Sequence, residues 1–447
     1  DLLIGAALLA LIIFLLISSI VLLSVRFELF VSPSSVTATT FDAVGVEGIL
    51  KSSVRPTSII IRYGTNNVTK LVDKDGFYYQ EARIVLRDSL SDITGISEIP
   101  EEEYRETKIS KSIQLDFEPA VNQRLLYGSL FLEDGSFGDF ENIREVLMPL
   151  ANDTSIYIMT SDGKFFRINN KAINYMPYVD NLSKQKYAKY YSLEELFDSS
   201  SDVLISDGAI SIPGYITASP FNEENSGPVS RSVFSSRYDF ANRIQELDGT
   251  TITSNDYGRE LLKISPDGRV LYSNTDALSN PVKTSMTSSL VIAYLFLDKF
   301  NLNNDVYTVE DVRDFTENGT NGYTFLLAPR IDGLRACLKN EDINTEISVV
   351  NGRVYSFSGL FRTYDESTEE SSEAADEYVF SALDVLNINY DSIKSLVGFK
   401  DSIELFDRIS LIDVVYVYDD ELNYVPAYKM IIGGKIFYFS TLSGEVF

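Results

Sequence analysis

The chain has 447 residues, of which 45% are apolar and 23% charged, a balance typical of folded globular proteins rather than disordered ones. The formal net charge of −27 disfavours binding to nucleic acid, because the phosphate backbone is also negative. There is no histidine and only one cysteine, Cys337, which excludes a histidine-based catalytic triad, the usual histidine zinc ligands and an internal disulfide.

Residues 1–26 are predicted to anchor the chain in a membrane. Leu2 to Val25 contain no charged side chain, and a helix of that length spans a hydrocarbon core of about 30 Å. A cleaved signal peptide is the alternative, but its apolar region is shorter and ends in a small-residue cleavage site, which Val25 to Leu29 do not offer. We expect a single-pass protein of the cell membrane with its N-terminus inside and a large extracellular part. Because residue 1 is Asp rather than Met, we also expect residues upstream of it.

Small and polar side chains in this span suggest a surface for another membrane helix. Ala6 and Ala10 have the spacing of small residues that lets two helices approach closely, and Gly5 lies beside them. Ser18 offers a hydroxyl for a hydrogen bond across such a contact. The alternative is that Gly5, Ala6, Ala10 and Ser18 face lipid and have no partner.

Residues 27–50 are predicted to form an extended stalk, because Val31 to Ala43 are rich in Ser, Thr and Val. An N-terminal α+β domain is then expected over residues 51–168. Its patterns predict strands at 58–63 and 111–118, helices at 80–90 and 140–150, and a hairpin of 155–160 with 164–168 around Ser161-Asp162-Gly163.

A central domain with a hairpin is predicted over residues 169–280. Ser192 and Glu195 have the spacing of a capping box, which predicts a short helix at 192–197. The patterns further predict loops at 198–207 and 222–231, a strand at 210–216, and a hairpin at 261–273 around Pro266-Asp267-Gly268.

The C-terminal third, residues 281–447, is predicted to be a duplicated unit of one helix followed by an antiparallel meander. The proposed halves are 290–364 and 374–447, separated by an acidic, serine-rich stretch at 365–375. The first half contains a helix at 289–300 and strands at 323–328, 345–350 and 353–357, with an Asn351-Gly352 turn; the second contains a helix at 374–386 and strands at 409–418, 425–432 and 435–440, with a Gly433-Gly434 turn. The whole extracellular part is therefore expected to be of the α+β class, with antiparallel sheets and packed helices.

The motifs that resemble catalytic signatures do not fit their chemistry. Ser161 to Lys164 match the Ser-x-x-Lys acylation motif, but that chemistry needs the start of a buried helix, and here a hairpin turn is predicted. Glu101 to Glu103 form a carboxylate run in a polar segment, which predicts a solvated surface rather than a cleft with two opposed carboxylates. Asp134 to Asn142 lack the ligand spacing of a calcium loop. We therefore expect no enzyme activity, no catalytic residue, no metal and no cofactor.

Several segments resemble the YycH family, which comprises membrane-anchored regulatory proteins of Gram-positive bacteria. In the N-terminal half these are Arg55 to Ile59, Tyr104 to Phe117, and Asp256 to Arg259 leading into 264–273. The C-terminal segments resemble the domain that YycH shares with its partner YycI: Tyr323 to Phe325, Val349 to Val354, and Val425 to Tyr428. Residues 281–447 are accordingly expected to form a YycI-like domain.

The resemblance implies a regulatory function in a two-component system. The chain would bind and modulate a sensor histidine kinase of the WalK (YycG) type, which controls cell-wall metabolism, together with a YycI-like protein. Two alternatives remain open. One is a surface receptor for a cell-wall fragment, a peptide or a lipid, and the other is a cell-wall hydrolase with a buried carboxylate pair.

Overall fold

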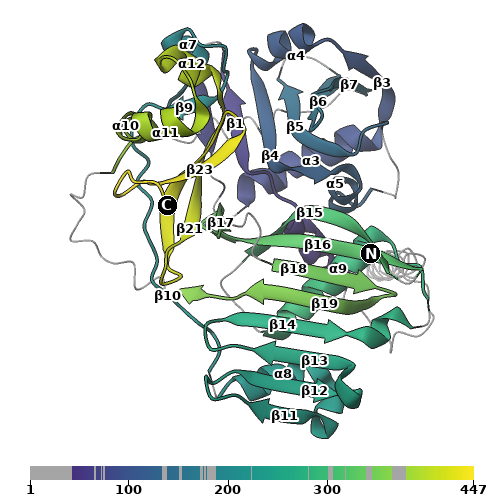
Figure 1. Cartoon of the computed structure of the whole chain (residues 1–447). Coiled ribbons are helices and arrows are strands. Elements are labelled where there is room, and N and C mark those ends of the chain that lie inside the picture. Colours follow the sequence, from purple (N-terminus) through teal and green to yellow (C-terminus); the bar gives the residue numbers. More distant parts are fainter. Residues whose placement is uncertain are drawn as a thin grey trace, which may run out of the picture.

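The computed structural model describes residues 43–447 apart from 65–66, 72, 74–75, 133–137, 151–153, 172–174, 176–177, 179–187, 223, 280, 301–305, 318, 339–344 and 365–378. Over these residues the fold is of mixed α+β class with large antiparallel sheets, which confirms that part of the prediction (Figure 1). No helix within the described ranges has the length and apolarity needed to cross a membrane. The predicted span from Leu2 to Val25 lies outside those ranges.

The described strands of the N-terminal half form a nine-stranded sheet, which we call the first sheet, in the order β3-β7-β6-β5-β4-β1-β2-β8-β9. Its strands are β1 (Ser58–Arg62), β2 (Val68–Leu71), β3 (Ile93–Ile99), β4 (Ser112–Asn122), β5 (Asn142–Pro149), β6 (Ser155–Thr160), β7 (Phe165–Asn170), β8 (Tyr190–Ser192) and β9 (Leu204–Ser206).

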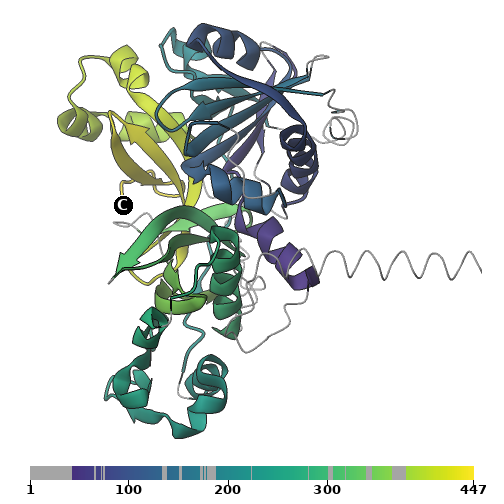
Figure 2. The same ribbon diagram turned by 90° about the vertical axis from the view of Figure 1, so that its right-hand side faces the viewer.

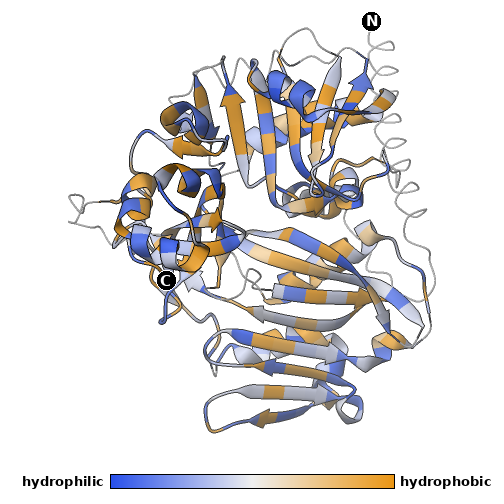
Figure 3. Cartoon of the chain, turned by 45° about the horizontal axis from the view of Figure 1, so that its top comes forward, coloured by the Kyte–Doolittle hydropathy of each residue, from blue (hydrophilic) through white to orange (hydrophobic). Residues whose placement is uncertain are grey.

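The two faces of the first sheet differ in chemistry. On one face, Ile59, Ile61 and Leu115 pack against helix α3 (Phe77–Ser91) in the main hydrophobic core. The opposite face carries polar side chains along β1 and β4, and helix α4 (Glu101–Lys108) packs there through the buried Tyr104. Figure 3 shows hydrophobic residues concentrated in the strands of this sheet.

The second sheet, again within the described residues, runs β11-β12-β13-β14-β19-β18-β16-β17-β21-β22-β23, with β15 paired to β16. All its pairs are antiparallel except β17 with β21, where Ala336 faces Tyr416. Its strands are β11 (Asn242–Gln245), β12 (Thr251–Asn255), β13 (Glu260–Ile264), β14 (Arg269–Asn274), β15 (Val306–Glu317), β16 (Thr320–Ile331), β17 (Leu334–Cys337), β18 (Thr345–Val350), β19 (Arg353–Leu360), β21 (Ile409–Tyr418), β22 (Tyr424–Ile432) and β23 (Lys435–Ser440).

Helices cover the second sheet in three places. Helix α9 (Met286–Leu297) packs on β16, β18 and β19, and helix α8 (Ser226–Phe234) lies behind β12, where Ser230 bonds Thr253. Helices α10 (Ala382–Ile388), α11 (Tyr390–Val397) and α12 (Ser402–Asp407) share a core with β21 to β23. The remaining described elements are α2 (Ala43–Ser53), α5 (Gln123–Ser129), α7 (Leu193–Phe197), the 3₁₀ helices η1 (Ser235–Phe240), η2 (Asp256–Gly258), η3 (Thr275–Leu278) and η4 (Asp298–Phe300), and the short pair β10 (Thr217–Ala218) with β20 (Thr363–Tyr364).

The helix predicted over 140–150 is wrong, because this segment is strand β5. β5 lies between β4 and β6, and both its faces are covered: Val146 and Met148 face the main core, while Leu147 packs with Tyr104. A strand buried on both faces has consecutive apolar residues, and this pattern imitates the face of a helix.

Other local predictions are also wrong. The predicted loop at 198–207 contains strand β9 (Leu204–Ser206). The predicted loop at 222–231 contains most of α8, whose Pro228 is in the first turn, where proline is tolerated. The predicted strand at 210–216 forms only one backbone bridge, between Tyr215 and Tyr424, and Pro213-Gly214 interrupts it. The predicted extended stalk is helical from Ala43, where α2 begins.

The sheets cross the predicted domain boundaries after residues 168 and 280. β8 and β9, from the predicted central domain, complete the first sheet, whereas β11 to β14 belong to the second sheet with β15 to β23. The main core contains buried residues from both sheets. The two sheets therefore share one hydrophobic interior.

Candidate functional site

Helix α2 is the first described element after the predicted membrane span, and it packs one face against both sheet layers while Glu47 and Gly48 are exposed. Val46, Leu50 and Val54 recur every four residues, which places them on one face of the helix, and all three are buried in the main core. α2 contacts α5 of the first sheet layer and α9 and β15 of the second. Figure 2 shows α2 in purple between these layers. A displacement of α2 would therefore act on both sheet layers.

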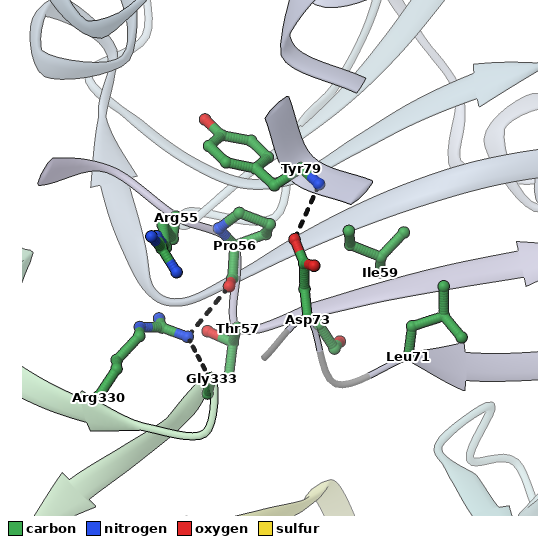
Figure 4. A pocket seen from close by; sticks show the side chains of 10 residues that line it. Arg55, Pro56, Thr57, Ile59, Leu71, Asp73, Tyr79, Arg330 and Gly333 are labelled. Carbon is green, nitrogen blue, oxygen red and sulfur yellow. Dashed lines mark hydrogen bonds between the residues drawn. The ribbon is translucent and has the colours of Figure 1, made fainter. Parts of the chain in front are cut away.

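The chain leaving α2 is fixed by an arginine of the second sheet. Arg330, a buried residue of β16, donates from Nη1 to the carbonyl oxygens of Pro56 and Gly333, each at 3.2 Å, and from Nε to Thr308 Oγ1 at 3.0 Å (Figure 4). Hydrogen bonds from a charged donor are among the stronger ones in proteins. We call Arg55, Pro56, Thr57 and Arg330 the junction, because they join α2, the first sheet and the second sheet.

The junction also fixes the start of β1 against β4. Thr57 donates its backbone N–H to the carbonyl oxygen of Asp116, and its hydroxyl exchanges two hydrogen bonds with the backbone of Glu118, at 2.8 and 3.1 Å. Asp73, on the other side, accepts the backbone N–H groups of Tyr78 and Tyr79 and so caps the first turn of α3. The polar groups of the junction thus satisfy backbone groups from several elements.

The junction surrounds a cavity of about 10 Å³, lined by Arg55, Asp73, Tyr79 and Arg330 among others (Figure 4). This volume corresponds to about one water molecule, so no organic ligand fits. Burial lowers the pKa of Arg330 and Arg55 adds to this, while Glu310 opposes it. Glu310 forms a buried ion pair with Arg335, with Nε and Oε2 3.0 Å apart. The junction is therefore held together by the charged side chain of Arg330 and by hydrogen bonds to backbone groups.

A second group of charges lies on the polar face of the first sheet, beside the junction. Arg62 of β1 donates from Nη1 to Gln114 Oε1 at 2.6 Å, and Gln114 in turn donates to Asp116. Asp116 also accepts the hydroxyl of Ser58 at 3.1 Å. Burial raises the pKa of Asp116 to about 6, and the nearby carboxylate of Glu145 acts in the same direction. Asp116 is thus a half-buried carboxyl whose pKa is raised towards neutral pH.

Lys108 completes this group. We call the group the polar network; it consists of Arg62, Lys108, Gln114, Asp116, Glu145 and Asp202. Lys108 Nζ, from the last turn of α4, lies 3.2 Å from Glu145 and 2.8 Å from Asp202. Burial lowers the pKa of Lys108, but the two carboxylates outweigh burial and the pKa is raised overall. Further along the same face, Lys70 of β2 forms an ion pair with Asp413 of β21. The C-terminal strands are therefore attached to the polar face of the first sheet.

An open groove of about 720 Å³ lies at the far edge of the first sheet. It is lined by Ile93, Ile96 and Glu98 of β3, with Tyr127 of α5 and Phe166 of β7 among the others. Its mixed apolar and charged lining and its size suit a peptide or a small organic fragment.

The segments that resemble the YycH family contribute Arg55, Pro56 and Thr57 to the junction and Asp116 to the polar network, and Lys164 lines the groove. Gly5, Ala6, Ala10 and Ser18 are outside the described residues, so the predicted helix interface stays a prediction. Arg330, Lys70 and Asp116 were missed, because their importance depends on elements distant in the sequence. One signal existed for Arg330, since it is a charge within the otherwise apolar run Phe325 to Ile331. Such a charge, when buried, needs partners from elsewhere in the fold.

Comparisons with known proteins give one weak likeness. No family model matches the chain, and no curated protein matches it. Among solved structures, the C-terminal domain of YpeB from Bacillus megaterium superposes with a TM-score of 0.27 at 12% sequence identity, covering 51% of this chain and 96% of that domain. A superposition at that score supports no conclusion about function. The evidence for function therefore comes from the sequence and from the geometry of this chain.

Proposed function

We propose that this chain is a non-enzymatic accessory protein of the YycH type, anchored in the cell membrane by Leu2 to Val25 with its folded part outside the cell. It binds a sensor histidine kinase of the WalK type and a YycI-like protein, and it modulates the control of cell-wall metabolism. The proposal includes the duplicated C-terminal unit, since α9 with β15 to β19 and α10 to α12 with β21 to β23 each place helices before an antiparallel meander.

The observation that carries this proposal is the position of α2. A protein that biases a kinase from the membrane needs a stiff connection between its membrane segment and its folded part, because a flexible linker transmits little. Here one face of α2, the first described helix after the predicted span, is buried against both sheet layers, and Arg330 binds the chain that leaves this helix. Contacts made by either sheet can then favour one signalling state of the kinase over another, provided that they differ in free energy between the states.

Co-purification tests the proposal. The full chain, extracted in mild detergent, should retain the kinase and the YycI-like protein. Replacing both Ala6 and Ala10 with leucine should weaken the kinase association if these residues form the helix interface. Ala7→Leu is the matched control, because it adds the same side chain at a position outside the four-residue spacing. If the full chain separates from a kinase–YycI-like complex that itself stays intact, the proposal is wrong.

A second candidate function, a receptor for a cell-wall peptide or fragment, is favoured by the groove at β3. Soluble peptidoglycan fragments that bind there should raise the melting temperature of the full chain, because ligands that bind only the folded state stabilise it. Ile96→Asp should abolish this shift by placing a charge in the groove. Ile109→Asp is the control, since Ile109 is exposed and does not line the groove. An equal shift for both variants would locate the binding elsewhere.

A further inference from the structure

The lower end of the second sheet differs in charge from the rest of the chain. We call residues Ser226–Ser279 the tip; they comprise α8, η1 to η3 and β11 to β14, and they lie at the bottom of Figure 1. The tip holds six basic and seven acidic residues, whereas the whole chain holds 38 basic and 65 acidic. A second copy of this strongly acidic protein therefore meets less repulsion at the tip than the average charge of the chain would give.

The tip also carries the most exposed large apolar side chains of the described residues. Leu247 and Tyr257 are fully exposed, Phe240 is 84% exposed and Ile244 is 59% exposed; no other large apolar residue in the described ranges exceeds 57%. Single exposed apolar residues are ordinary, but here four lie within 18 residues of sequence, on the edge strand β11 and in the segments next to it. Exposed apolar side chains gathered along an edge strand favour protein association.

Ile244 belongs to β11, the edge strand of the second sheet. Every residue of β11 is exposed, and its register with β12 is regular, without a bulge or a proline. Natural edge strands are usually protected by such features or by charges that project over the edge. Arg243 is the charge within β11, and its guanidinium is drawn back over the ring of Tyr238, 4.4 Å from the centroid, and donates to the Tyr238 hydroxyl. The edge is therefore open to another strand.

The register of β11 fixes which residue would lie at the centre of a symmetric pairing. Glu246 donates its N–H to Thr250, so in the alternating antiparallel ladder Ile244 bonds inward to Ile252. On the free edge, Ile244 then occupies a non-hydrogen-bonded position, where side chains of opposed strands come closest. A two-fold axis perpendicular to the sheet at Ile244 places Ile244 of one copy opposite Ile244 of the other. In this register Arg243 of each copy faces Gln245 of the other, so no like charges of β11 lie opposite each other.

A row of side chains on the open face of the sheet, apolar except for Lys263, supports the same centre. Ile244 faces Ile252, which faces Lys263, which faces Leu271 on β14. These residues lie on the face away from α8, since the neighbouring row contains Thr253, which bonds Ser230 of α8. A pairing at Ile244 joins the row of one copy to the row of the other.

We propose that two copies of this chain associate through antiparallel pairing of their β11 edges, with Ile244 at the two-fold axis. The second sheet then continues from one copy into the other. Opposed residues at a non-hydrogen-bonded position have their Cα atoms about 4.5 Å apart, which is within the range that a disulfide bridges.

Cysteine cross-linking tests the proposal on the full chain in mild detergent. Ile244→Cys should give a disulfide-linked dimer under a gentle oxidant. Leu271→Cys is the matched control, because Leu271 is exposed in the same row but lies three strands from the axis. The native Cys337 is fully buried and should not react. Equal dimer yields for the two variants would overturn the proposal.

A second variant separates this contact from any association through the membrane segment. Ile244→Lys places two like charges at the axis and should weaken the dimer by about tenfold or more in dissociation constant, measured as particle mass by light scattering. Because Ile244 is exposed, the circular dichroism spectrum of the variant should match that of the wild type. A monomeric wild type, or a dimer that persists unchanged in Ile244→Lys, would contradict the proposal.

Discussion

The Nζ atom of Lys70 on β2 lies 2.9 Å from Oδ1 of Asp413 on β21, and both side chains are buried. This ion pair joins the first sheet to the C-terminal strands across most of the sequence. Burial lowers the pKa of Lys70, but Asp413 outweighs burial and raises it overall.

Breaking this pair on one side should be costly. Lys70→Met leaves a buried carboxylate without its cation and should lower the free energy of unfolding by about 3–5 kcal/mol, measured by urea denaturation. The double variant Lys70→Met with Asp413→Asn should recover most of the loss. Lys164→Met, which breaks the exposed pair with Asp162, is the control and should change stability by less than about 1 kcal/mol. Equal effects of the two lysine variants would refute the importance of burial.

Asp116 should make the stability of the fold depend on pH. Its pKa is about 6 in the folded chain and about 4 in an unfolded one, so between these values the folded state binds more protons. The stabilisation from protonation is present below pH 4 and is lost as the pH rises through 6.

The free energy of unfolding of the wild type minus that of Asp116→Asn should therefore fall by roughly 3 kcal/mol from pH 4 to pH 7. Denaturant titrations at several pH values measure this difference. A difference that is flat, or that rises with pH, would show that Asp116 is ionised in the folded chain across this range.

Arg330→Met should weaken the joint between α2 and the two sheets. It leaves the carbonyl oxygen of Pro56 and the hydroxyl of Thr308 without this donor in a buried setting, at a cost of about 2–4 kcal/mol in unfolding free energy. Hydrogen exchange of the α2 amides should become faster as well. Arg313→Met, on exposed β15 surface, should change neither quantity appreciably. If hydrogen exchange of the α2 amides is unchanged in Arg330→Met, Arg330 does not hold α2 against the two sheets.

Two turn glycines with the same backbone requirement should respond differently to alanine. Gly163 and Gly268 both have positive φ, +78° and +96°, which costs an alanine about 1 kcal/mol. A Cβ at Gly163 meets nothing within 4 Å, whereas at Gly268 it would collide with the carbonyl oxygen of Phe361. Gly268→Ala should therefore lower the melting temperature by clearly more than Gly163→Ala does. Equal shifts would show that the backbone at Phe361 moves away to make room for the added methyl group.

The hairpins were predictable from the sequence because their turns are specified locally. Asn351-Gly352 and Gly433-Gly434 all adopt positive φ, as the sequence pattern requires, and each joins a pair of antiparallel strands. Gly163, in the turn between β6 and β7, also has a positive φ. The helix α7 was predictable too, because Ser192 accepts the N–H of Glu195 as the capping pattern implies.

The rest depends on tertiary contacts that no local pattern encodes. β5 imitates a helix because both its faces are covered, and α2 lies in a segment whose composition is typical of a linker. The junction was not predictable, since Arg330 gains its role from Pro56, far away in the chain. The polar network follows the same logic: the alternation of Ser112, Gln114 and Asp116 predicted strand β4 correctly, but not the charged residues of α4 that cover its polar face.

The position of β21 has a consequence for the order in which the protein matures. The N-terminal sheet is synthesised first, yet Asp413 and the strands that hold it come from the last part of the chain. Until β21 arrives, Lys70 has no carboxylate from it and one face of the early sheet stays open to water. Pairing β17 with β21 also requires contact between segments about 80 residues apart, which is slow. A nascent chain cut short before β21 would therefore stay partly unfolded and be open to proteolysis.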